Sequence, residues 1–84
     1  MMNKETLCNN LDTLLQRVKL DLADNEEMKN HIKLLMQFTK ENEINSQEEY
    51  DEVETIFKSE KDIIKKYALL LLLNGYCEKQ EREQ

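Results

Sequence analysis

The segment from Ile63 to Leu73 constrains the fold of this chain more than any other, because its apolar residues do not stay on one side of a helix. The six consecutive apolar residues from Ala68 to Leu73 cover more than a full turn at about 3.6 residues per turn. No side of that turn is polar, so the rest of the chain has to cover it. Because a bilayer span needs roughly 20 apolar residues, we expect no membrane segment.

The composition leaves helices as the regular structure that this chain builds most easily. Its 84 residues include no proline and one glycine, and good helix formers stand almost everywhere. The residues that sheets use for turns and bulges are therefore missing. We predict a single all-α domain over residues 1–84, a small antiparallel helical bundle in which the segment 63–73 is central.

Apolar spacing and a capping signal define the first two helices. The apolar residues from Asn3 to Leu22 recur at steps of three and four, which is typical of one side of a helix. A capping box at residues 24–27 predicts the start of a second helix. We expect Ala23 and Asp24 alone to connect the two helices in a tight hairpin, and the pattern of the second helix is lost at residues 40–42.

The second half of the chain allows two interpretations. After the linker 43–45, a capping box at residues 46–49 predicts a third helix. We prefer a break near residues 59–62 and hence four helices in all; the alternative is three helices with a long, bent last one. Asn74 and Gly75 are expected to stop the last helix, which leaves residues 75–84 as a frayed polar tail.

The centre of each apolar stripe predicts the core. Because apolar residues one helical turn apart share a side of the helix, these positions are expected to point inward. The predicted core residues are Leu11, Leu14, Leu15, Val18, Ile32, Leu35, Val53, Phe57, Ile64, Tyr67 and Leu71.

The negative charge of the chain is concentrated in one segment. The formal net charge is −6, yet residues 41–54 hold seven acids and no Lys or Arg, whereas the other 70 residues hold 11 acids and 12 bases. Acids in a first helical turn complement the helix dipole, but Glu52 and Glu54 lie beyond that turn, where like charges repel. We predict that this acidic segment binds a basic protein surface. The predicted partner-binding residues are Glu41, Glu43, Glu48, Glu49, Asp51, Glu52 and Glu54.

Signals of catalysis and of metal binding are weak. Residues 41–52 carry oxygen ligands at the spacing of an EF-hand loop, but Ser46 stands where that loop needs glycine and Glu48 where it is apolar. His31 is the lone histidine, expected on the flank of its helix, and no nucleophile can be placed beside it. We expect no enzymatic activity, no catalytic or metal site and no cofactor.

Cysteine usage and the first residues indicate the compartment. Cys8 and Cys77 lack a pairing framework, so we expect both thiols to stay reduced. Residues 1–6 contain no apolar stretch of the kind that signal peptides have. The lysines are dispersed, with one adjacent pair at 65–66, which argues against direct nucleic-acid binding. We expect a cytoplasmic protein that contacts neither a membrane nor nucleic acid.

Two functions are consistent with the sequence. The first is an inhibitor, as immunity proteins and phage-type antagonists are, whose acidic segment docks on a basic nuclease or nucleic-acid-binding protein in the place of phosphates. The second is a structural or regulatory homo-oligomer, such as a dimer, formed through the apolar surplus of the last helix. Its predicted self-association residues are Leu69, Leu70, Leu72, Leu73 and Tyr76. The segregation of charge favours the first.

Overall fold

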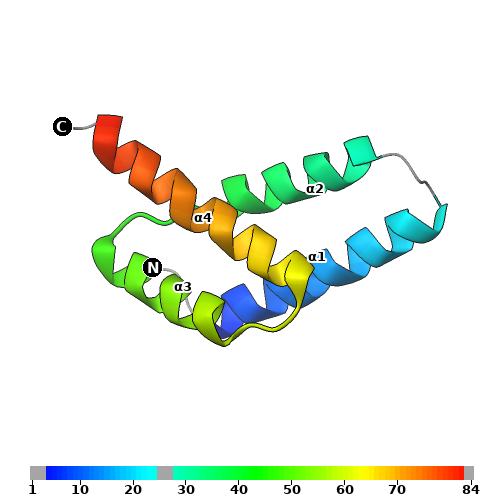
Figure 1. Ribbon diagram of the computed structural model, residues 1–84, viewed down its shortest axis with the longest axis horizontal. Coiled ribbons are helices and arrows are strands. Elements are labelled where there is room, and N and C mark those ends of the chain that lie inside the picture. The colour runs from blue at the N-terminus through cyan, green and yellow to red at the C-terminus, as the bar shows by residue number, and fades with distance from the viewer. Residues whose placement is uncertain (1–3, 25–27, 83–84) are drawn as a thin grey trace.

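The structure, a computed structural model, describes residues 4–24 and 28–82 and has four helices in those ranges (Figure 1). The helices are α1 (Lys4–Asp24), α2 (Met28–Glu41), α3 (Gln47–Ser59) and α4 (Ile63–Arg82). None of the described residues lies in a β-strand. The prediction of a small all-α bundle is confirmed, and so is the preference for four helices over three.

α4 is the central helix of the bundle. It contacts each of the other three helices, and α1 and α2 also pack on one another. In Figure 1, α1 and α2 form a long hairpin, α4 crosses in front of it, and α3 runs back beside α4. The hairpin reaches past the first turn of α4, so the bundle is elongated, with extents of 42 × 26 × 20 Å. The apolar segment that needed cover is therefore packed against three helices.

The buried face of α4 differs from the predicted one. Its buried residues are Ala68, Leu69, Leu72, Leu73 and Tyr76. The predicted core residue Tyr67 is 52% exposed, and Ile64 and Leu71 are partly buried. The prediction continued the spacing of α3 into α4. Because residues 60–62 are not helical, α4 starts with a register of its own, shifted from the predicted one by one or two positions.

The core prediction holds better in the first three helices. Leu11, Leu14, Val18 and Val53 are buried as predicted, and Leu15, Leu35 and Phe57 are partly buried. The prediction for Ile32 is wrong, because α2 turns Phe38 and His31 inward and leaves Ile32 51% exposed. His31 is therefore a buried residue and not one on the flank. Ile44, assigned to the linker, is only 2% exposed and joins the core.

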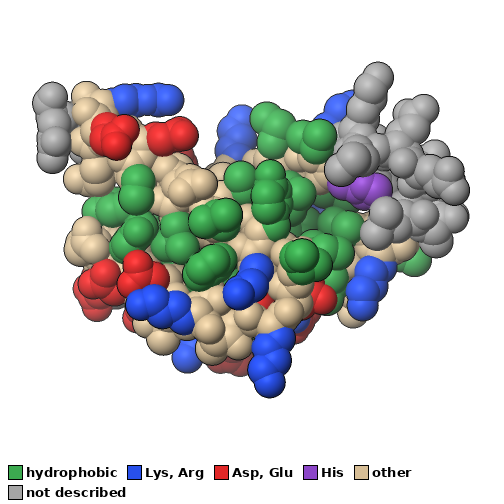
Figure 2. Space-filling view, viewed as in Figure 1, with side chains coloured by type: hydrophobic (Ala, Val, Ile, Leu, Met, Phe, Trp, Pro, Cys, Tyr) green, Lys and Arg blue, Asp and Glu red, His purple; other side chains and the backbone are tan. Residues whose placement is uncertain are grey.

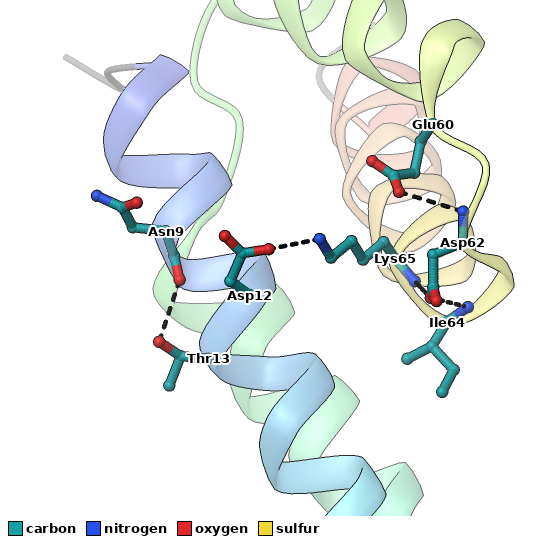
Figure 3. Close-up of polar contacts among 7 residues, drawn as sticks. All are labelled: Asn9, Asp12, Thr13, Glu60, Asp62, Ile64 and Lys65. Carbon is teal, nitrogen blue, oxygen red and sulfur yellow. Dashed lines mark hydrogen bonds and ion pairs between the residues drawn. The ribbon is translucent and has the colours of Figure 1, made fainter.

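The start of α4 is fixed by acidic side chains (Figure 3). The Asp62 carboxylate accepts hydrogen bonds from the backbone N–H groups of Ile64, at 2.9 Å, and Lys65, at 3.1 Å, which is the geometry of an N-cap. Glu60 accepts a hydrogen bond from the backbone N–H of Asp62 at 3.2 Å. The Lys65 side chain forms an ion pair with Asp12 of α1. The break predicted near residues 59–62 is thus held by local hydrogen bonds.

α4 does not stop at Asn74 and Gly75. The helix continues to Arg82, and Gly75 has no positive φ, so the predicted stop is wrong, and the described residues of the predicted tail, up to Arg82, are helical. The next residue gives the reason: Tyr76 is buried, and its ring centroid lies 5.4 Å from that of Tyr50. Packing of two aromatic rings stabilises the turn that follows the glycine.

The connection between the first two helices also differs from the prediction. Ala23 and Asp24 belong to α1 and do not form the connector. Asn3, from which the first helix was expected to start, and residues 25–27, which make up most of the first capping box, lie outside the described residues.

Candidate interaction surfaces

The acidic segment, residues 41–54, starts at the last residue of α2, passes through the linker 42–46 and covers the first two turns of α3. Buried Ile44 ties the linker to the core. The Ser46 hydroxyl accepts a hydrogen bond from the backbone N–H of Glu49 at 3.2 Å, so Ser46 is the predicted N-cap of α3. The carboxylates of this segment therefore stand on a fixed backbone.

Glu49 differs from the other acids of the segment because it points inward. Its side chain is 7% exposed, and its carboxylate accepts a hydrogen bond from the backbone N–H of Asn45 at 3.4 Å. In a capping box the Glu49 carboxylate would accept a hydrogen bond from the backbone N–H of the cap residue, Ser46. Here it accepts the hydrogen bond of Asn45 instead, one residue before the cap. Glu49 thus supports the start of α3 and is not available to a partner in this conformation.

Glu48, Asp51 and Glu52 lie on the outer side of α3. All three are exposed, and since Asp51 and Glu52 follow Glu48 by three and four positions, their Cβ atoms each lie about 5–6 Å from that of Glu48 along the helix. Asp51 accepts a hydrogen bond from the Gln47 amide at 3.0 Å. Among the described side chains, the ion pairs of Lys58 with Glu54 and of Lys65 with Asp12 do not involve these three residues. We call them the α3 carboxylate face.

The remaining predicted acids lie at the margins of this face. Glu54 forms an ion pair with Lys58, one turn further along α3, at 3.4 Å. Glu41 accepts a hydrogen bond from the Gln37 amide at 3.0 Å, and Glu43 is exposed in the linker. The structure therefore brings three of the seven predicted residues together on one side of one helix and distributes the others around them.

The last turns of α4 lie beside the acidic segment. The Lys79 ammonium donates a hydrogen bond to the Asn45 side chain at 3.5 Å, and the Cys77 sulfur and the Tyr50 hydroxyl share a hydrogen bond at 3.8 Å. The hydrogen bond with Cys77, and to a smaller extent the negative charge nearby, raises the pKa of Tyr50 above its usual value. These contacts were not predicted, because the expected helix stop at Gly75 would have removed them.

Most of the predicted self-association residues lie in the interior. Leu69, Leu72, Leu73 and Tyr76 are buried, and Leu70 is 39% exposed. Most of the expected apolar surplus is covered within the chain, because α1, α2 and α3 all contact α4. Self-association stays a prediction, and in this conformation these four side chains are covered within the chain.

Large apolar side chains are exposed where α2 and α4 lie next to one another. They are Ile32 and Met36 on α2, and Ile63, Tyr67 and Leu70 on α4. Figure 2 shows hydrophobic side chains gathered over this part of the molecule. Because they recur every three or four residues, they form one stripe on each helix. We call these five residues the α2–α4 apolar face; the sequence analysis missed it because Ile32 and Tyr67 were assigned to the core.

The surface between the two stripes is hollowed. One hollow, of about 510 Å³, has Val18 of α1, Leu35 of α2 and Ile64 of α4 among its lining residues, together with exposed residues of the apolar face. A second, of about 480 Å³, follows along the contact of α2 with α4 and is lined by Leu71 and Gly75 among others. The face is therefore a groove and not a flat patch.

Other chemistry in the described part of the chain is sparse. No three of its His, Cys, Asp or Glu side chains come together as metal ligands. Cys8 and Cys77 are free thiols. None of the helices in residues 4–24 and 28–82 is both long and apolar enough to cross a membrane.

Comparison with known proteins found no match: no family model, no curated protein and no solved structure is similar to this chain.

Proposed function

We propose that this chain is a small protein-binding module that inhibits a partner with a basic surface, such as a nuclease or a nucleic-acid-binding protein. The observation that carries the proposal is the α3 carboxylate face, with exposed acids on one side of a capped helix. Carboxylates at this spacing attract a basic cleft and can occupy it in the place of phosphates. Because the inner side of α3 is anchored by buried Val53 and Ile56, little conformational freedom is lost on binding.

The charge distribution supports the same function. Residues 41–54 contain seven acids and no Lys or Arg, whereas the rest of the chain is nearly neutral. A local field of this kind speeds the encounter with an oppositely charged partner by about 10- to 10³-fold at low salt. Salt screens it over a Debye length of about 8 Å at physiological ionic strength.

The experiment compares two variants with the same change in net charge. In Glu48→Gln/Glu52→Gln, two carboxylates of the α3 face are neutralised; in the control, Glu78→Gln/Glu81→Gln, two exposed acids near the end of α4 are neutralised. The wild type and the control should capture the same basic protein from the host proteome, and the α3 variant should lose it. Glu49 is left intact because its carboxylate supports the start of the helix.

The association rate then tests the mechanism. With the captured protein in hand, the rate should fall steeply as the salt concentration rises from about 50 to 500 mM, because exposed charges act mainly on the rate of encounter. Inhibition of the partner's activity on nucleic acid should follow the same salt dependence. A rate that is insensitive to salt, or equal loss of binding in the control, would contradict the proposal.

The second function suggested by the sequence, a homo-oligomer formed through the last helix, has less support. Four of its five predicted residues are covered within the chain. The apolar side chains that stay exposed have lysines beside them, which a symmetric dimer would bring toward one another. We therefore prefer the inhibitor.

A further inference from the structure

The α2–α4 apolar face is large enough to be a contact surface. Its five side chains are between 39% and 81% exposed. With about 200 Å² for a fully exposed side chain of this size, they present on the order of 600 Å² to solvent. Patches of about 300–600 Å² are the largest that typical monomers expose, and they are often functional.

The shape of this face suits a helix. The hollows of about 510 and 480 Å³ follow one another along the contact of α2 with α4. From Ile63 to Gly75, α4 runs for about 18 Å, at 1.5 Å per residue, which is about three helical turns. A groove of this length, lined by apolar side chains at helical spacing, is the kind of surface on which an amphipathic helix docks.

Gly75 keeps the second hollow open. Nothing lies within 4 Å of the position that a Cβ atom would take there, and the backbone has no positive φ that would require glycine. Glycine is a poor helix former, so the fold of the chain itself gives no reason for it in the middle of α4. A bare backbone at this point lets a second backbone approach closely.

Lysines lie on both flanks of the groove. Residues 31–40 of α2 and 63–77 of α4 contain four lysines and no acid. On α2, Lys33 and Lys40 are exposed on the side of the helix beyond the apolar stripe. On α4, Lys66 lies on the other flank, with its ammonium 5.3 Å from the centroid of the Phe57 ring. The apolar groove therefore has lysines on both flanks, although its second hollow also has Glu43 and Glu78 among its lining residues, beside Lys40 and Lys79.

We propose that this groove docks an amphipathic helix of a partner protein, with apolar residues against the α2–α4 apolar face and acidic residues beside the lysines. A second copy of the chain fits less well, because a symmetric contact sets lysine flanks against lysine flanks. An anionic membrane attracts lysines too, but a flat lipid surface leaves the hollows unfilled. The groove shares no residue with the α3 carboxylate face, so this proposal does not depend on the proposed inhibitory function.

Selection of peptides against the immobilised full chain tests the proposal. The library holds helical peptides of about four turns, with leucines along one side and all other positions randomised. The selected peptides should be enriched in Asp and Glu beside the leucine stripe. The best of them should bind the wild type at least about tenfold more tightly than a version with lysines in place of these acids.

Variants of the chain locate the binding site. Tyr67→Glu should weaken binding of the acidic peptide at least about tenfold, because it places a charge in the apolar face. The matched control is Leu20→Glu, which alters a side chain of α1 that is 67% exposed and lies outside the groove, and it should bind like the wild type. The double variant Lys33→Glu/Lys66→Glu should reverse the preference in favour of the lysine-flanked peptide. Circular dichroism and thermal unfolding check that each variant is folded.

Several results would overturn the proposal. One is a selection that yields no binder, or binders that are not enriched in acids. Another is peptide binding that Tyr67→Glu leaves unchanged. A wild-type dimer in sedimentation that Tyr67→Glu abolishes would assign the face to a second copy. Binding to phosphatidylserine vesicles that the same variant abolishes would assign it to a membrane.

Discussion

α3 and α4 pack against one another, yet their outer sides differ in kind. α3 turns Val53 and Ile56 inward and presents carboxylates to solvent. α4 also buries one side, including Leu69, but it keeps Tyr67 and Leu70 exposed on the other. In α3, the apolar residues lie on the inner side and the charged residues mostly on the outer side, so the sequence pattern itself distinguishes the two. In α4 apolar residues stand on both sides, so the positions of the neighbouring helices decide which of them are buried.

The largest effect should separate the two sides of α4. Leu69→Ala removes a side chain that is fully buried, and the free energy of unfolding should fall by about 2–5 kcal/mol. Leu70→Ala, one position further along, should cost clearly less, about 1 kcal/mol, because that residue is 39% exposed in the free chain. Chemical denaturation of both variants measures the difference. Equal costs would show that the register of α4 is not the one described.

The caps of the two helices should have similar and smaller effects. Ser46→Ala at the start of α3 and Asp62→Ala at the start of α4 each remove an acceptor for backbone N–H groups, at a cost of about 0.5–2 kcal/mol. Glu48→Gln, in the first turn of α3 but without such a bond among the described contacts, serves as the control. Its unfolding midpoint in urea should stay close to that of the wild type. A loss in Glu48→Gln as large as in Ser46→Ala would contradict the assignment of the cap.

A substitution in α4 should increase stability. Gly75→Ala places a methyl group where no atom lies within 4 Å, in a helical residue without positive φ. We expect a gain of about 0.5–1 kcal/mol in the free energy of unfolding, from the better helix propensity of alanine. If Gly75 ended the helix in a left-handed conformation, the same substitution would instead be destabilising. The sign of the change in melting temperature therefore decides between a continuous α4 and a helix that stops here.

The smallest effect concerns the ion pair between α4 and α1. The hydrogen bond with Asp12 raises the pKa of Lys65 above its usual value, so the folded chain favours the charged ammonium. The stabilisation is therefore complete below the ordinary lysine pKa of 10.5 and is lost as the pH rises through the raised pKa. Because Asp12 is 61% exposed, Asp12→Asn should cost less than about 1 kcal/mol near neutral pH. Urea denaturation of both proteins at neutral and strongly alkaline pH should show the difference shrinking, and a constant difference would contradict the pairing.

Features that depend on neighbouring residues could be predicted from the sequence, and features that depend on tertiary contacts could not. The cap at Ser46 and the break before Ile63 follow from short-range signals. By contrast, Ile44 is buried because helices far apart in the sequence enclose it, and Ile32 is exposed because α4 crosses α2 further along. Gly75 combines both cases, since the local signal for a stop is overridden by the packing of Tyr76.

The candidate surfaces divide in the same way. The acidic segment is visible as a run of charge, but that Glu49 turns inward while Glu48 and Glu52 stay outside depends on the cap geometry. The α2–α4 apolar face is not visible in the sequence at all. Its stripes lie on helices 31 positions apart, counted from Ile32 to Ile63, and only the crossing of those helices brings them together.

The central place of α4 has a consequence for biosynthesis. It is the last of the four helices to be translated, and it supplies the contacts that join α3 to the α1–α2 hairpin. A chain still on the ribosome can form the local α1–α2 hairpin, but its apolar sides stay uncovered until α4 has emerged. Folding of this domain is therefore expected to be completed in one step at a late point of translation, and until then the exposed leucines of the first helices are available to chaperones.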